Sequence, residues 1–156
     1  MADDGTAGPK ADRGLRRRAR AVRAFVFMSR LFEYECRELE VSMAQYRMLL
    51  YLRHGPRRAG ELAARASITR PSLSTSIAAM EKQGLLRRTT VDDDRRGVKL
   101  ELTRKGLLAI DRIEERFGEI FDDAAKDCDR GRLLDALEEL TRSLNDQIEA
   151  RVRPED

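Results

Sequence analysis

The chain has 156 residues, of which 41% are apolar and 38% are charged, and its formal net charge is +3. This size corresponds to about one domain, and no apolar run reaches the roughly 18–20 residues that a membrane span needs. Cys36 and Cys128 lie far apart and His54 is the single histidine, which excludes a disulfide scaffold and a cysteine- or histidine-rich metal site. We therefore expect no metal or cofactor, and the polar N-terminus does not look like a secretory signal.

Charge is distributed unevenly along the chain. Residues 1–52 hold 10 basic and 7 acidic residues, residues 53–105 hold 13 and 6, and residues 106–156 hold 8 and 15. A basic segment attracts polyanions, and nucleic acids are the commonest polyanionic partners. The middle third is therefore the expected place for a nucleic-acid contact, with an accidental imbalance between segments as the alternative.

The N-terminal part predicts a tail followed by one long helix. Residues 1–13 hold too little apolar surface to offset the entropy of ordering, so they predict a disordered tail. From Leu15 to about Glu40 no proline interrupts the chain, and its apolar residues are too dense for one stripe, so this helix is expected to be buried on more than one side. We interpret the basic run at 16–20 as a solvated face, and a phosphate contact is the less favoured alternative.

Two further helices are predicted next. Ser42 can cap a helix over 43–53, which Gly55 and Pro56 end in the order typical of a helix C-terminus. A short helix is predicted over 60–66, followed by a turn. The segment therefore begins as two helices joined by a glycine–proline break.

A third helix and a hairpin complete the middle of the chain. The helix is predicted over 69–83, with Thr69 as its N-cap. Apolar and polar residues then alternate over 98–102, which predicts a strand there. We expect this strand to pair with a second strand over 86–91. A charged tip at 92–97 joins these two strands.

The last third returns to helical periodicity. Apolar residues recur three and four positions apart over 107–124 and again over 133–148. Asp127 or Asp129 can cap the second of these helices, and residues 151–156 are predicted to fray. Two amphipathic helices in so charged a chain need a partner surface.

The helix over 69–83 carries the most informative surface. Leu73, Ile77 and Met80 share one face and are expected to pack inward. Small hydroxyl residues occupy much of the remainder; they lower helix propensity but allow close approach to a phosphate backbone and to base edges. A merely exposed serine-rich helix is the alternative. The expected nucleic-acid contacts are Thr69, Arg70, Ser72, Ser74, Thr75, Ser76 and Lys82.

The hairpin tip offers a second candidate contact. Asp94 can pair with Arg96 and hold the tip in place while Arg95 projects from it. An arginine on a thin β-tip can enter a minor groove. The acidic residues at 92–94 weigh against this contact, and a solvated turn is the alternative.

Residues 60–88, followed by 92–106, resemble the MarR family of bacterial transcriptional regulators. The family signature is D-x-R, then five residues, then L-T, with G three positions after the threonine. One departure is Ser67, where many helix-turn-helix sequences have glycine. The resemblance extends over about 15–150. The residues that match the signature are Asp94, Arg96, Leu102, Thr103 and Gly106.

The resemblance implies a mainly α fold with a small β-hairpin wing. A winged helix-turn-helix DNA-binding region at 42–103 is then combined with a helical dimerisation region at 14–41 and 104–150. It also implies a cytoplasmic homodimer that presents two 69–83 helices to successive major grooves of pseudo-palindromic double-stranded DNA. Such a dimer would repress transcription until a small aromatic or anionic compound releases it; the sequence does not indicate the ligand-binding residues. The dimer contacts expected on this basis are Val22, Phe25, Leu107, Phe117, Leu133, Leu137, Leu140 and Leu144.

Three other functions fit the sequence less well. A thiol-based redox regulator needs a reactive thiolate, and acidic neighbours of Cys36 and Cys128 disfavour one. An enzyme built on Cys36 and His54 has no third group to orient the pair. A winged helix used only for protein contact is disfavoured by the basic segment at 53–105, and DNA footprinting would distinguish it from a regulator.

Overall fold

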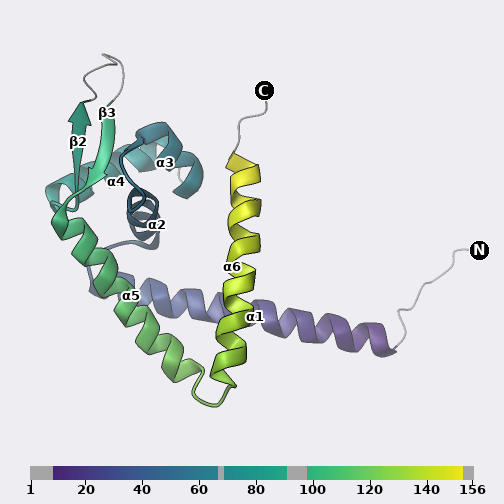
Figure 1. Cartoon of the computed structure of the whole chain (residues 1–156). Coiled ribbons are helices and arrows are strands. Elements are labelled where there is room, and N and C mark those ends of the chain that lie inside the picture. Colours follow the sequence, from purple (N-terminus) through teal and green to yellow (C-terminus); the bar gives the residue numbers. More distant parts are fainter. Residues whose placement is uncertain (1–8, 67–68, 91–97, 153–156) are drawn as a thin grey trace, which may run out of the picture.

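The computed structural model describes residues 9–66, 69–90 and 98–152 (Figure 1). Six helices and three short strands follow one another in this part of the chain. The helices are α1 Pro9–Glu38, α2 Met43–Leu52, α3 Ala59–Ala66, α4 Arg70–Lys82, α5 Arg104–Ala124 and α6 Arg130–Val152. The strands are β1 Arg57–Arg58, β2 Leu86–Thr90 and β3 Val98–Leu102. The predicted mainly helical winged helix-turn-helix fold is confirmed.

The strands form one small antiparallel sheet in the order β1-β3-β2. The predicted hairpin is confirmed, with Leu86 opposite Leu102 and Thr90 opposite Val98. The third strand, β1, pairs Arg57 with Leu100 and was not predicted, because two residues are too few to show an alternating pattern. The sheet therefore has one more strand than the hairpin alone.

Local capping residues set several helix ends as expected. Ser42 accepts a hydrogen bond from the Gln45 backbone, and the Gln45 side chain accepts one from the Ser42 backbone, so α2 begins with a capping box. Asp129 Oδ1 accepts a hydrogen bond from the Arg132 backbone at 3.2 Å. This contact identifies Asp129, one of the two predicted alternatives, as the cap of α6.

Two predicted boundaries need correction. The tail was predicted to include residues 9–13, but α1 begins at Pro9, because proline is tolerated in the first turn of a helix. Gly14, just before the expected start of this helix at Leu15, lies inside it, since an interior glycine costs only about 1 kcal/mol. At the other end, α6 includes residues 151–152, which were expected to fray.

The core lies where α2, α4, the sheet and the first half of α5 meet the end of α1. Its largest fully buried side chains include Met48, Met80, Leu100 and Ile110. Helix α5 extends from the sheet and packs against α1, whereas α6 returns to contact α3. None of the helices in the described ranges is long and apolar enough to span a membrane.

Phe117 is a correction to the predicted dimer surface. Its ring stacks on Phe32 at 4.1 Å between centroids and meets the edge of Tyr46 at 5.2 Å. Only 9% of Phe117 is exposed. This side chain is therefore part of the core of a single chain. The sequence did not reveal this, because apolar periodicity marks a buried face without saying which partner covers it.

Candidate nucleic-acid interface

Helix α4 presents the predicted polar surface. Leu73, Ile77 and Met80 are buried, as expected from their spacing. The opposite side is solvent-accessible: Thr69, Ser72, Ser74, Thr75 and Lys82 are exposed and Ser76 is half-buried. Arg70 is the first residue of α4, and its side chain lies outside the described part of the structure.

The first turn of α4 is suited to an anion. Thr69 caps the helix with extended backbone, but its hydroxyl donates to Ser72 Oγ at 3.0 Å instead of capping a backbone N–H. The Ser72 hydroxyl then keeps its own proton for an outside acceptor. The first turn contains no acidic residue, so no carboxylate within that turn opposes the positive end of the helix dipole, which favours a phosphate.

Thr75 lies one turn further along α4. Its hydroxyl donates to the Pro71 carbonyl oxygen at 3.3 Å, which fixes the side chain along the helix surface. The side chain therefore offers a polar hydroxyl and an apolar methyl group. The hydroxyl can contact a base edge and the methyl group can contact a thymine methyl. This position can therefore contribute to sequence preference.

The C-terminus of α4 is tied to the sheet. The backbone N–H groups of Gly84 and Leu85 donate to Glu81 and Met80 carbonyl oxygens, both at 2.9 Å, and Gly84 has φ +71°. This is a Schellman motif, for which a left-handed glycine is the favoured residue. Glu81 also accepts from Arg88 Nε at 2.9 Å, so α4 is held against β2.

The start of α5 closes over the same turn and forms what we call the α4–α5 joint (residues 83–85 and 103–106). The Thr103 hydroxyl donates to the Gly84 carbonyl oxygen at 2.6 Å and accepts from the Gly106 backbone at 3.1 Å. Lys105 Nζ donates to the Gln83 carbonyl oxygen at 2.7 Å. The sequence marked Thr103 and Gly106 through the family signature, and the joint gives their physical role.

The predicted tip residues Asp94, Arg95 and Arg96 lie outside the described residues. The strands that lead to the tip are described, and β2 and β3 rise together beside α4 (Figure 1). At their base Arg87 pairs with Glu101 at 3.0 Å. The geometry of the wing tip therefore stays a prediction.

The predicted dimer contacts fall into two groups once Phe117 is removed. Val22, Phe25, Leu107 and Leu144 expose 56, 52, 43 and 44% of their surface. Leu133, Leu137 and Leu140 are half-buried. Further exposed apolar side chains were not among the individually predicted contacts, although they lie in α1, α5 and α6, the helices expected to form the dimer. These additional side chains are Leu15, Val26, Phe27, Leu31, Tyr34, Leu108, Leu134 and Ile148.

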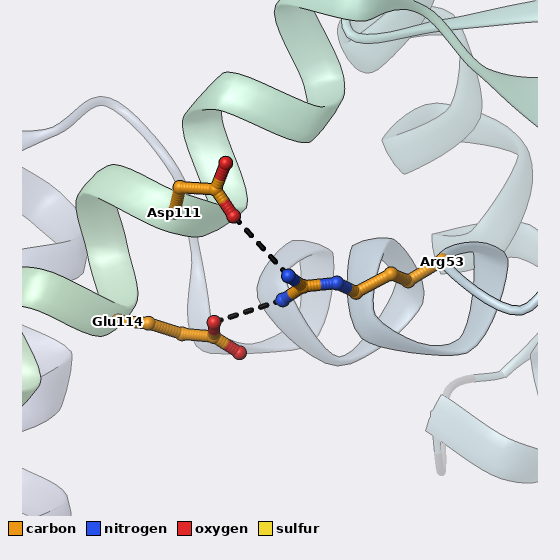
Figure 2. Close-up of polar contacts among 3 residues, drawn as sticks. All are labelled: Arg53, Asp111 and Glu114. Carbon is orange, nitrogen blue, oxygen red and sulfur yellow. Dashed lines mark hydrogen bonds and ion pairs between the residues drawn. The ribbon is translucent and has the colours of Figure 1, made fainter.

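Ion pairs connect the winged-helix part to the long helices. Arg53, at the end of α2, reaches Asp111 at 3.3 Å and Glu114 at 2.9 Å on α5 (Figure 2). The hydrogen bond and charge of Glu114 raise the pKa of Arg53 above its ordinary value. Arg116 of α5 similarly reaches Glu35 of α1 at 3.2 Å. Sequence reasoning missed these contacts because the partners lie far apart along the chain.

A groove of about 620 Å³ lies between α2, β1 and α6. The Arg57 guanidinium lies over the Tyr51 ring at 5.3 Å from its centroid. Arg57 Nε is buried and has no hydrogen-bond acceptor among the described residues. Arg47 adds a second cation, and Ile148 adds apolar surface. The groove therefore combines positive charge with an apolar wall, as a small aromatic anion requires, and Glu149 adds one acidic side chain to its lining.

Cys36 is an inert core residue in this structure. It is fully buried, and its thiol donates to Met43 Sδ at 3.5 Å. Burial, with smaller contributions from Glu33 and Glu35, raises its pKa to about 11. A thiol of this kind is neither a good nucleophile nor a good redox sensor. His54 is exposed, so Cys36 and His54 do not form a catalytic pair.

Comparisons with known proteins agree with this geometry. A family model described as MarR family matches residues 39–97. NadR in complex with 4-hydroxyphenylacetate is 26% identical, with a TM-score of 0.64 over 92% of this chain and 97% of that chain. A transcriptional regulator from Thermotoga maritima is also 26% identical, with a TM-score of 0.65 over 86% of this chain and 98% of that chain.

A more distant solved structure shares the fold. A MepR mutant from S. aureus, bound to an oligodeoxyribonucleotide, is 18% identical and has a TM-score of 0.61 over 83% of this chain and 96% of that chain. None of the curated proteins matches the chain.

Proposed function

Because this chain belongs to the MarR family of winged-helix transcriptional regulators, we propose that it represses transcription as a homodimer on pseudo-palindromic double-stranded DNA. A small aromatic anion would release it. The observation that carries the DNA-binding part is the exposed, hydroxyl-lined first turn of α4, which has no acidic residue. The DNA-bound MepR structure supports the same role. Family members are regulators, which argues against an enzyme.

Thr75 provides the sharpest test of DNA reading. Thr75→Val keeps the shape of the side chain and removes its hydroxyl, so it should change the preferred sequence in a binding-site selection. Thr141→Val is a matched control, because the Thr141 hydroxyl makes the same kind of contact with Leu137 O at 2.8 Å on α6. Equal sequence preference in both variants would refute a reading role for Thr75.

DNA contact by the wing can be tested separately. If Arg95 meets a phosphate, Arg95→Ala should lower the slope of log affinity against log salt by about one unit. If Asp94 and Arg96 hold the tip, Arg96→Ala should weaken DNA binding. Unchanged affinity and slope in a titration would reject a DNA-contacting wing. Absence of footprints on genomic DNA would instead favour the winged helix as a protein-contact module.

Dimerisation is supported by the exposed apolar side chains of α1, α5 and α6, because monomers rarely leave so many large apolar groups in water. Leu137→Glu combined with Leu144→Glu should abolish the dimer in sedimentation and DNA binding with it. Ser143→Glu combined with Ala150→Glu places the same two charges on a different side of α6, about 120° around the helix, and is the matched control. A variant at 137 and 144 that stayed dimeric would show that the interface is misplaced.

Ligand release is supported by the α2–β1–α6 groove and by the ligand of NadR. A small aromatic acid would place its carboxylate near the Arg47 and Arg57 side chains and its ring against the apolar wall. We expect 4-hydroxyphenylacetate, used as the probe, to weaken DNA binding in fluorescence anisotropy. Arg57→Met should remove this effect and Arg58→Met should retain it, because neighbouring strand residues face opposite sides. Equal responses would exclude this groove.

A further inference from the structure

A small cavity of about 320 Å³ lies where the turn after α1, the end of α4 and the first half of α5 meet. We call it the joint cavity, because it borders the α4–α5 joint. It shares no lining residue with the α2–β1–α6 groove. Its size is at the lower end of the range for ligand sites, which suits a small molecule. Its apolar lining consists of Leu39, Val41, Leu85, Leu108, Ala109 and Ile113.

Gln83 contributes an unused hydrogen-bond acceptor to the joint cavity. Its side-chain Nε2 donates to the Glu40 carbonyl oxygen at 3.0 Å, and its backbone oxygen accepts from Lys105 Nζ at 2.7 Å. Its side-chain Oε1 is buried and has no donor among the described residues. Buried polar atoms nearly always have a partner. A ligand that brings an N–H group to Gln83 Oε1 would therefore complete this site.

The joint cavity is also lined by charges of both signs. Glu40 lies in the turn after α1, and Arg112 lies on α5. Both side chains are exposed, and neither makes an ion pair or hydrogen bond with another described residue. Lys105 Nζ adds a second cation, which keeps protons for a ligand because an ammonium group has three.

These charges select the class of ligand. A simple anion would be attracted by Arg112 and Lys105 but repelled by Glu40, and a simple cation would meet the opposite problem. A molecule that carries one positive and one negative group can satisfy both sides at once. Because the rest of the lining is apolar, the remainder of that molecule should be apolar as well.

We propose that the joint cavity binds a free apolar α-amino acid. Its ammonium group pairs with Glu40 and donates to Gln83 Oε1, its carboxylate pairs with Arg112 and Lys105, and its side chain covers the apolar lining. The ligand then contacts the turn after α1, the end of α4 and α5 together. This binding requires neither the proposed homodimer nor the α2–β1–α6 groove, so it is a separate input to the DNA-reading helix.

The first test uses the unmodified full chain and isothermal titration calorimetry, with L-leucine as the probe. Three analogues each lack one part of it: 4-methylpentanoate lacks the ammonium group, 3-methylbutylamine lacks the carboxylate, and glycine lacks the apolar side chain. We expect each analogue to bind at least about 10-fold more weakly than L-leucine, because each leaves one part of the lining without its partner.

The second test assigns each end of the ligand to a residue. Arg112→Gln should weaken L-leucine about 10-fold but should not weaken 3-methylbutylamine, which has no carboxylate to lose. Glu40→Gln should weaken L-leucine to a similar extent but should not weaken 4-methylpentanoate. Arg104→Gln and Glu38→Gln are the matched controls. They remove the same charges from exposed residues outside the lining and should leave L-leucine binding unchanged.

Several results would overturn the inference. These are a wild-type chain that does not bind L-leucine, analogues that bind as tightly as L-leucine, and wild-type affinity for L-leucine in the Arg112→Gln or Glu40→Gln variant. Loss of L-leucine binding in Arg57→Met but not in Arg112→Gln would place the amino acid in the α2–β1–α6 groove and also overturn it. The analogue series needs no substitution, so it decides the matter even where a variant fails to fold.

Discussion

Replacing Gly106 by alanine would put a methyl group into space that the α4–α5 joint already fills. The added Cβ would lie 2.0 Å from the Leu85 carbonyl oxygen and 3.2 Å from Leu102 Cδ2. Real Cβ atoms essentially never approach within 3.0 Å, so the backbone at Leu85 or the start of α5 must move by about 1 Å. The same oxygen accepts from the Thr103 backbone at 3.1 Å, and this bond would be strained as well.

The expected cost follows from these contacts. Overpacking costs about 1–3 kcal/mol, and a weakened hydrogen bond adds about 0.5–1.5 kcal/mol. The better helix propensity of alanine offsets about 0.5–1 kcal/mol of this loss in stability. We therefore expect Gly106→Ala to lower the free energy of unfolding by about 2 kcal/mol, measured by urea titration followed by circular dichroism.

Gly118 is the matched control on the same helix. Outside its own helix backbone, no atom of the described residues lies within 4 Å of a Cβ added there, so Gly118→Ala should stabilise the chain by about 0.5–1 kcal/mol. Both variants must be compared at one protein concentration, because dimerisation contributes to apparent stability. A Gly106→Ala variant as stable as the wild type would refute the close approach of α5 to the end of α4.

Three further outcomes are expected from single positions. Glu40 lies in the turn after α1 and has φ +58°, so Glu40→Gly should raise the free energy of unfolding by about 0.5–1 kcal/mol, and a loss in urea titration would contradict this. Thr103→Val removes the cap of α5 and should cost about 1–2 kcal/mol by the same assay; no loss would argue against the joint. Burial raises the pKa of Cys36 from 9.0 to about 11, so the thiol ionises first in the unfolded chain. Its contribution to the free energy of unfolding is therefore fully present below pH 9.0 and is lost as the pH rises towards 11. A thiol reagent at pH near 8 should modify Cys128 in the folded chain and reach Cys36 only in urea, and rapid reaction of both would refute the burial.

Much of the fold was predictable because its determinants are local. The capping box at Ser42, the left-handed Gly84 and the switch of period before Val98 each act within a few residues of chain. The inward face of α4 followed from helical spacing alone. These features locate the winged helix and its hydroxyl-lined surface.

The remaining features depend on residues that meet only after folding. Arg53 contacts Asp111 and Glu114 across 58 and 61 positions of sequence, and no short-range pattern signals such a pair. Phe117 shares the periodicity of the surface leucines, yet Phe32 covers it within the same chain. The groove at Arg57 depends on a strand too short to predict and on the return of α6.

The α4–α5 joint has a mechanical consequence. Because residues of α5 occupy the carbonyl groups that end α4, neither helix can tilt alone without breaking Thr103 and Lys105 contacts. A tilt of α5 is therefore expected to move the end of α4 through these contacts. A signal received anywhere along α5 would therefore arrive at α4 as a change of aim, while the secondary structure of both helices stayed intact.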